Sequence, residues 1–297
     1  IHRTADNLIH LNHHCFAGAR DFRANFRVLV AGGGTGDSTV YLAEQLREFS
    51  ARIVHLDFSA ASMAVAQARS RERGLDNITW VHASLMDLPR LGLGHFDYIN
   101  CTGVLHHLES SEAGLRILAE SLEPDGAMLL MLYGRHGRRS VYNMQELLRV
   151  YLSADMAIPD KIRMTRQLLG ALPSSNGFLR DADRWQEEIS PQGLGDAGLY
   201  DLLLHSCDRS FDVPALYSLT DSADLDILAF VDRALDYEPR THLGTATIAT
   251  HLDGLDTRRR QAIAELMVGD LNSHEFYVGH RGRHRAASLD DERNALV

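Results

Sequence analysis

The chain has 297 residues, of which 45% are hydrophobic and 24% are charged, as in a globular protein with a sizeable core. Its net charge of −10 argues against anionic partners, so we expect neither nucleic acid nor a membrane. Three widely spaced cysteines form no disulfide framework and no CxxC metal motif, and no apolar run is long enough to span a bilayer. With no signal peptide pattern either, these features predict a cytoplasmic protein.

From residue 27 to residue 133, short apolar runs alternate with segments of helical periodicity. This alternation predicts a parallel, doubly wound α/β sheet with helices on both faces, in which ligands bind beyond the carboxyl ends of the strands. A turn is expected at residues 124–126, before the fifth strand. Strands are expected at residues 28–31, 53–56, 78–82, 96–100 and 127–133, with helices at 38–49, 62–73 and 112–122.

After Tyr133 the regular alternation ends and helical patterns dominate. Two further strands are expected at residues 226–231 and 275–279, separated from the first five by helical segments. The clearest helical segments are residues 141–152, 160–169, 212–223 and 257–266.

A run of glycines, Gly32-Gly33-Gly34-Thr35-Gly36, lies between the first predicted strand and its helix. Small residues there let a ligand approach the backbone, and the helix that follows presents free N–H groups. Asp57 ends the next strand, where a carboxylate can accept the hydroxyls of a ribose. The pattern predicts a site for a nucleoside-containing cofactor, with a tight structural turn and a solvated Asp57 as the alternative.

A nicotinamide cofactor would use the same two elements, but its fingerprint carries a third Gly or Ala where this chain has Asp37. A carboxylate at that helix N-terminus would repel a pyrophosphate. An NAD-dependent dehydrogenase is therefore the weaker alternative.

Five stretches in this order resemble class I S-adenosylmethionine-dependent methyltransferases, and in particular a bacterial subgroup sometimes fused to tetratricopeptide repeats. The resemblance implies a Rossmann-like seven-stranded sheet, a last strand antiparallel to the fifth and sixth, and S-adenosyl-L-methionine as the cofactor. The stretches are residues 28–37 (VLVAGGGTGD), 54–59 (VHLDFS), 77–88 (NITWVHASLMDL), 96–108 (FDYINCTGVLHHL) and 122–130 (LEPDGAMLL).

The resemblance also implies cofactor contacts for individual residues. The glycines would cradle the methionine part, Asp57 would hold the ribose, and Phe58 would lie beside the adenine. Two positions depart from the family pattern, because Val30 and Ser84 stand where acidic residues are usual. Compensating contacts could come from Asp37, Asp87 and the N-terminal segment. The cofactor-binding residues implied are Gly32, Gly34, Gly36, Asp37, Asp57, Phe58, Ser84, Leu85, Asn100, Cys101 and Thr102, the last three bordering the sulfonium.

His106 and His107 follow the fourth strand, and Tyr133 ends the fifth, so all three are candidate catalytic residues at the rim. A neutral imidazole there can accept a proton from an acceptor N–H or O–H. The alternative is that the histidines only pack or cap, because methyl transfer can proceed by alignment alone.

Two other groups of side chains invite a functional interpretation. Arg135 and its arginine neighbours 138 and 139 could bind a substrate carboxylate, or form a solvated loop. His10 and His14 share one helical face, but no third ligand completes a metal site, so we predict no metal.

We predict one α/β domain whose helical insertions form a cap over the rim. The predicted function is methyl transfer to a nitrogen or oxygen of a small molecule or peptide. The alternative is a cofactor-binding module without catalytic activity. The sequence does not decide between a monomer and a homodimer. In chain order we expect an N-terminal helical segment over the cofactor site (1–26), the cofactor-binding core (27–135), a helical insertion (136–207), the sixth-strand part of the core (208–238), a second helical insertion (239–273), the last strand (274–281) and a tail (282–297).

Overall fold

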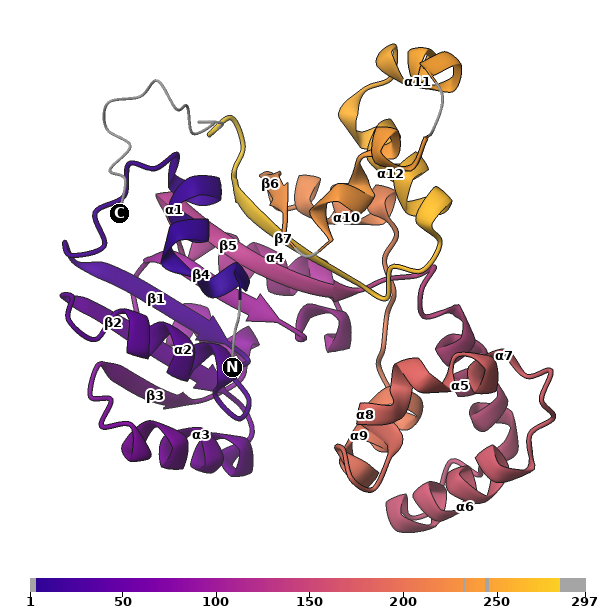
Figure 1. The fold of residues 1–297 in the computed structure, drawn as a ribbon. Coiled ribbons are helices and arrows are strands. Elements are labelled where there is room, and N and C mark those ends of the chain that lie inside the picture. Colours follow the sequence, from indigo (N-terminus) through magenta and orange to yellow (C-terminus); the bar gives the residue numbers. More distant parts are fainter. Residues whose placement is uncertain (1–3, 232, 244–245, 284–297) are drawn as a thin grey trace.

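The computed structural model describes residues 4–231, 233–243 and 246–283, and its centre is a seven-stranded sheet (Figure 1). The strand order is β3-β2-β1-β4-β5-β7-β6. This confirms the predicted Rossmann-like, doubly wound arrangement. The strands are β1 (Phe26–Ala31), β2 (Ala51–Asp57), β3 (Ile78–His82), β4 (Phe96–Thr102), β5 (Leu122–Tyr133), β6 (Leu225–Phe230) and β7 (Ser273–His280).

The first five strands are parallel, and β7 lies antiparallel between β5 and β6. The predicted pairing of the last strand is thus confirmed. The turn expected at residues 124–126 is not separate from β5, because Leu122 already pairs with Phe96 and the register shifts before Ala127 pairs with Tyr98. The three residues form an irregularity inside a longer strand.

Apolar side chains alternate between the two faces of the sheet and build two cores. One core packs under α1 (Leu8–Phe16) and α2 (Asp37–Gln45), with Leu11 and Leu42 fully buried. The other packs under α4 (Ser111–Glu120) and α10 (Val213–Asp221), while α3 (Ala60–Glu72) lies beside β2 and β3. The parallel strands are therefore covered on both faces, and their carboxyl ends lie together at one end of the sheet, the rim.

The first insertion leaves the sheet at the end of β5 and projects beyond the carboxyl ends of the strands (Figure 1). It has a core of its own, in which Phe178 and Trp185 are the largest side chains. No helix among the described residues is long and apolar enough to cross a membrane. The insertion comprises α5 (Arg139–Tyr151), α6 (Ile158–Ala171), α7 (Gly177–Arg180), η4 (Ala182–Trp185), α8 (Gln186–Ile189), α9 (Gly195–Leu199) and η5 (Tyr200–Leu204).

The second insertion lies between β6 and β7 and packs through α12 (Thr257–Val268) against α10. Its other elements are η6 (Ala234–Tyr237), η7 (Pro239–His242) and α11 (Ala246–Asp253). At the other end of the chain, η1 (Thr4–Asp6) and α1 lie on the sheet, with η1 near the tip of β1 (Figure 1). Of the predicted tail, residues 284–297 lie outside the described residues.

Candidate functional site

The glycine run forms a tight loop from the end of β1 to the start of α2. Gly32, Gly34 and Gly36 have positive φ angles of 72°, 51° and 89°, which favour glycine over any residue with a Cβ. A Cβ at Gly32 would meet Val104, whereas a Cβ at Gly34 would meet nothing within 4 Å. The loop is therefore packed against the protein at its start and faces open space at Gly34.

Asp57 holds this loop in place from the end of β2. Its Oδ2 accepts a hydrogen bond from the backbone N of Gly34 at 2.7 Å, and its Oδ1 accepts one from the backbone N of Ser59 at 2.7 Å. Each carboxylate oxygen keeps a second lone pair for a ligand hydroxyl. The next residue, Phe58, is 78% exposed, so an apolar ring lies open beside the carboxylate.

Asp37 pairs with Arg69 of α3, with Oδ1 2.6 Å from Nη2. The same arginine donates through Nη1 to the backbone O of Thr35 at 2.9 Å. The carboxylate that would repel a pyrophosphate thus fastens the glycine loop to α3. The cofactor contact implied for Asp37 is untested and stays a prediction.

Ser84 and Leu85, implied at the adenine edge, begin the 3-10 helix η2 (Leu85–Arg90). The hydroxyl of Ser84 accepts from the backbone N of Met86 at 3.2 Å, which caps the helix. The side chain of Leu85 packs in the core, so a ligand contact from this residue would come from its backbone.

At the end of β4, three neighbouring residues take different environments. Asn100 is 1% exposed, and its Nδ2 donates to Oδ1 of Asp6 at 2.8 Å and to Oγ of Ser38 at 3.3 Å. Thr102 donates to Oδ1 of Asn100 at 3.2 Å. Cys101 packs in the opposite core, where burial raises its thiol pKa to about 12 and keeps it protonated.

The two histidines lie on the 3-10 helix η3 (Leu105–His107), which begins beside the glycine loop because Val104 packs against Gly32. The ring of His106 is fully buried and lies 3.8 Å from the ring of Tyr133, centroid to centroid. Burial, and then the nearby charges of His107 and Arg138, lower the pKa of His106 to about 2. His106 is therefore neutral and a poor general base.

His107 is half-buried and oriented differently. Its Nδ1 lies 2.9 Å from the backbone O of Cys207, at the end of the first insertion. A carbonyl oxygen can only accept, so Nδ1 carries the proton and Nε2 keeps a lone pair. The insertion thereby fixes the tautomer that a general base requires.

A buried polar cluster joins the sheet to the first insertion. The guanidinium of Arg138 lies 3.6 Å above the ring of Tyr133, and its Nη2 is 3.8 Å from Oδ2 of Asp208. Asp208 also accepts from the hydroxyl of Tyr142 at 3.2 Å and from Nε2 of Gln145 at 2.8 Å. The sequence left Arg138 as a substrate ligand or part of a solvated loop. It gave no motif for Asp208, Tyr142 and Gln145, which complete the cluster.

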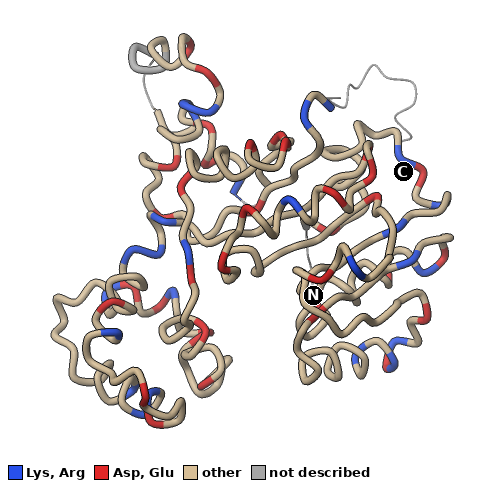
Figure 2. The backbone as a smooth tube through the Cα atoms, turned by 180° about the vertical axis from the view of Figure 1, so that it is seen from behind, with Lys and Arg blue, Asp and Glu red and all other residues tan. Residues whose placement is uncertain are grey.

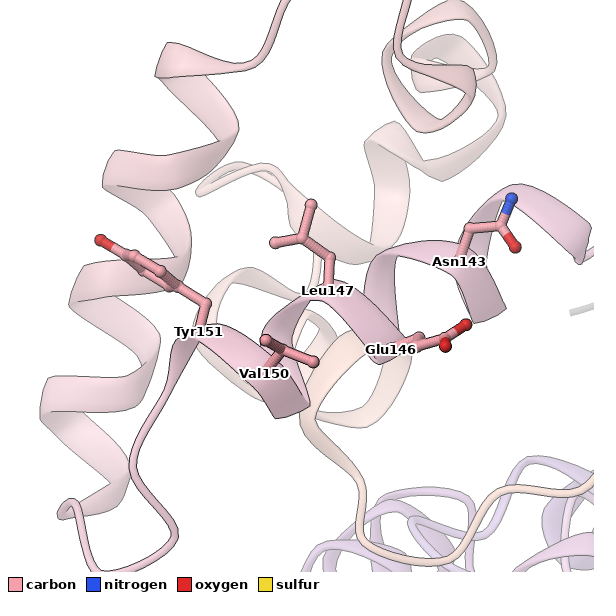
Figure 3. Close-up of a pocket in the computed structure, with 5 residues that line it drawn as sticks. All are labelled: Asn143, Glu146, Leu147, Val150 and Tyr151. Atoms are coloured by element: carbon pink, nitrogen blue, oxygen red, sulfur yellow. The ribbon is translucent and has the colours of Figure 1, made fainter.

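The arginines that flank this cluster in sequence lie at the surface. Arg135 pairs with Asp212 at 2.7 Å, and Nη2 of Arg139 lies 3.3 Å from Nδ1 of His136. A separate depression runs along one face of α5 (Figure 3). It contains no residue of the glycine loop or of the polar cluster, and Val150 on its wall is 86% exposed.

The loop, the carboxylate and the exposed ring fit an adenosine cofactor that carries an amino-acid tail. A carboxylate at Asp57 suits the ribose, Phe58 suits the base, and the open side of Gly34 admits the ligand close to the backbone. Among the described residues, no three His, Cys, Asp or Glu side chains are grouped so that they could hold a metal ion.

Comparison with known proteins identifies this segment, because residues 28–126 match the methyltransferase domain family. The chain carries a class I methyltransferase domain. The cofactor of this class is S-adenosyl-L-methionine, and the predicted NAD-dependent dehydrogenase is set aside.

Three relatives extend the similarity. An uncharacterized protein of Synechococcus sp. is 32% identical over 85% of this chain and 60% of its own length. A ubiquinone/menaquinone biosynthesis C-methyltransferase of Shewanella sp. is 29% identical over 41% of the chain and 49% of its own length. A tRNA 5-carboxymethoxyuridine methyltransferase of Escherichia coli is 28% identical over 58% of the chain and 62% of its own length. The chain thus spans about half to three fifths of the length of these relatives.

Among solved structures, PKMT2 from Rickettsia typhi in complex with AdoHcy superposes with a TM-score of 0.71. The match covers 94% of this chain and 54% of that chain at 15% identity. At this identity the likeness establishes the fold alone, over 94% of this chain.

Proposed function

We propose that this chain transfers the methyl group of S-adenosyl-L-methionine to a nitrogen or oxygen of a small molecule or peptide. The observation that carries the proposal is the position of η3. Its Val104 packs on the glycine loop, and its His107 is held by the first insertion. A cofactor on the loop and an acceptor under the insertion would meet beside this imidazole.

In this proposal His107 is the general base, because its Nε2 can accept the proton that the acceptor loses. His106, Tyr133 and Arg138 form a stacked column behind it and hold the rim rigid. Alignment of the acceptor with the sulfonium supplies most of the rate, so the base contributes only part of it.

The proposed acceptor class rests on charge and on the position of the first insertion. Figure 2 shows Lys and Arg interspersed with Asp and Glu along the described chain, which argues against a continuous basic track. Binding of a polynucleotide requires such a track. The first insertion projects beyond the carboxyl end of β5 (Figure 1), and an acceptor held between it and the end of β4 would be a small molecule or one side chain of a flexible peptide.

The proposal is tested in two steps. Calorimetry measures binding of S-adenosylhomocysteine to the wild-type chain and to Asp57→Asn, with Asp76→Asn, at an exposed residue before β3, as the control. Methyl-labelled cofactor is then incubated with a cell extract divided into small-molecule, peptide and RNA fractions. Label in the first or second fraction, lost with Asp57→Asn, supports the proposal. Label confined to RNA overturns the acceptor class, and cofactor binding without label in any fraction favours the non-catalytic alternative.

A further inference from the structure

Asp6 is an acidic side chain with no exposed surface, and it lies at the carboxyl end of β4. Its Oδ1 accepts hydrogen bonds from the hydroxyl of Tyr98 at 3.0 Å and from Nδ2 of Asn100 at 2.8 Å. Both donors belong to β4, whereas Asp6 comes from η1, more than 90 residues earlier in the chain. The N-terminal segment therefore delivers a carboxylate to the rim.

This carboxylate lies on the face of the sheet toward which Val30 points. Val30 pairs with Asn100 across β1 and β4, and Val30, Tyr98 and Ala5 belong to the same core. The glycine loop begins two residues after Val30. Asp6 thus packs on the face of the sheet toward which residue 30 points, next to the paired residues Val30 and Asn100. An acidic side chain at position 30 would project toward the same place.

Several contacts fix the position of Asp6. Its backbone O accepts from Nε2 of Gln45 at 2.9 Å, and Oε1 of the same glutamine accepts from the backbone N of Leu8 at 3.1 Å. The hydroxyl of Tyr277 donates to the backbone O of Ala5. Anchors on α2 and β7 therefore hold η1 on both sides.

The contacts orient the amide of Asn100. Nδ2 is directed to Asp6 and Ser38, so Oδ1 is directed to the other side, where Thr102 donates to it. An amide whose N–H₂ is bonded to a carboxylate presents a more negative oxygen, which favours a nearby cation. A buried carboxylate is stable only where hydrogen bonds or opposite charge compensate it, and the donors of Tyr98 and Asn100 contribute to this at Asp6.

We infer that Asp6 is the positioning residue through which this chain replaces the missing acidic residue at position 30. It acts through Asn100 on the ammonium group at the amino-acid end of S-adenosylmethionine. The inference rests on the proposed use of this cofactor. It assigns a binding role to the N-terminal segment, which would otherwise only cover the site.

Calorimetry with two ligands tests the inference. S-adenosylhomocysteine carries the amino-acid end with its ammonium, whereas methylthioadenosine has only the adenosine end. Asp6→Asn keeps the shape of the side chain and removes its charge. We expect its dissociation constant for S-adenosylhomocysteine to rise about tenfold. The constant for methylthioadenosine should stay within about twofold of wild type, within ordinary mutational scatter. Asp21→Asn, at an exposed N-terminal acid, should change neither constant.

Thermal unfolding of each variant without ligand provides the folding control. If Asp6→Asn does not fold, Asn100→Ala is measured instead, because removing the amide should give the same selective loss. Equal loss for both ligands indicates a merely structural role and overturns the inference, as does loss for neither. If the wild-type chain binds neither ligand, the proposed function itself fails, and this outcome is distinct from a selective failure of the variant.

Discussion

The imidazole of His106 lies against the phenol ring of Tyr133, with the two centroids 3.8 Å apart and the planes inclined by 28°. This stacked pair joins the end of β4 to the end of β5, at the point where the first insertion begins. Neither ring nitrogen of His106 has a hydrogen-bond partner in the described part of the chain. The pair is therefore a packing contact, and under the proposed function the proton acceptor is the neighbouring His107.

The first prediction separates these two histidines. His107→Gln should lower kcat about 100-fold, because a general base contributes on that order, while binding of S-adenosylhomocysteine stays unchanged. His106→Phe keeps the stack on Tyr133 and should retain most of kcat. A large loss of kcat in His106→Phe with none in His107→Gln would reverse the assignment.

The second prediction concerns pH. Burial lowers the pKa of His106 to about 2 in the folded chain, against about 6.5 in the unfolded chain. Below pH 6.5 the unfolded state therefore binds this proton more readily than the folded state does. The contribution of neutral His106 to the free energy of unfolding is complete above pH 6.5 and is lost as the pH falls. Between about pH 7.5 and 5, the loss from this one group is about 2 kcal/mol. Urea unfolding of wild type and His106→Phe at both pH values measures it, and the variant should show a shallower dependence. Identical pH dependence in the two proteins would contradict the assigned shift.

The third prediction concerns Asp57, whose carboxylate is expected to bind the ribose of the cofactor. Asp57→Asn should weaken binding of S-adenosylhomocysteine by about 1.5–3 kcal/mol, the range for hydrogen bonds to a charged group. Part of this loss comes through the loop, because the amide cannot accept from both Gly34 and Ser59 with its N–H₂ end. Calorimetry checks the value, with exposed Asp76→Asn as the control. An unchanged affinity would remove Asp57 from the cofactor site.

The strands and the glycine loop could be predicted from the sequence because their signals are local. A run of apolar residues ended by glycines, and an acidic residue at the end of the next strand, need no knowledge of the rest of the chain. The observed strand boundaries differ from the predicted ones by up to five residues. The largest difference is at β5, which begins at Leu122 because this residue already pairs with Phe96.

The partners of the site residues could not be predicted, because they come together only through the fold. Asp6 and Asn100 are 94 positions apart, and no motif marks Asp6 in the sequence. Likewise, the spacing of the arginines after Tyr133 gives no sign that the middle one is buried. Arg138 meets Asp208 only because the insertion returns to the sheet beside its own starting point.

The fourth prediction tests the pairing at Asp37. Its partner Arg69 is one-quarter exposed and Asp37 nearly half exposed, so solvent screens the pair. Asp37→Asn and Arg69→Gln should each destabilise the chain by less than about 1 kcal/mol, and a double-mutant cycle should give a coupling of about 0.5 kcal/mol. Arg69→Gln should change binding of S-adenosylhomocysteine only slightly, since the backbone N of Gly34 still donates to Asp57. Asp37→Asn should weaken binding more than Arg69→Gln does, because the family resemblance implies a cofactor contact for Asp37. Equal small losses in the two variants would contradict that contact.

The last prediction concerns the buried cluster at the base of the first insertion. The side chains of Arg138 and Asp208 are 5% and 0% exposed, so removing one charge leaves the other buried without compensation. Arg138→Met should destabilise the chain by about 3–5 kcal/mol, measured by urea unfolding, and should also remove the cation from the face of Tyr133. In the double variant with Asp208→Asn much of this loss should be recovered, because the amide still accepts from Tyr142 and leaves no unpaired charge. Limited proteolysis locates the effect: cleavage should rise first within the insertion in Arg138→Met and return toward the wild-type rate in the double variant. If the double variant instead loses as much stability as the two single variants together, the two residues are not coupled. The pair would then not join the insertion to the sheet.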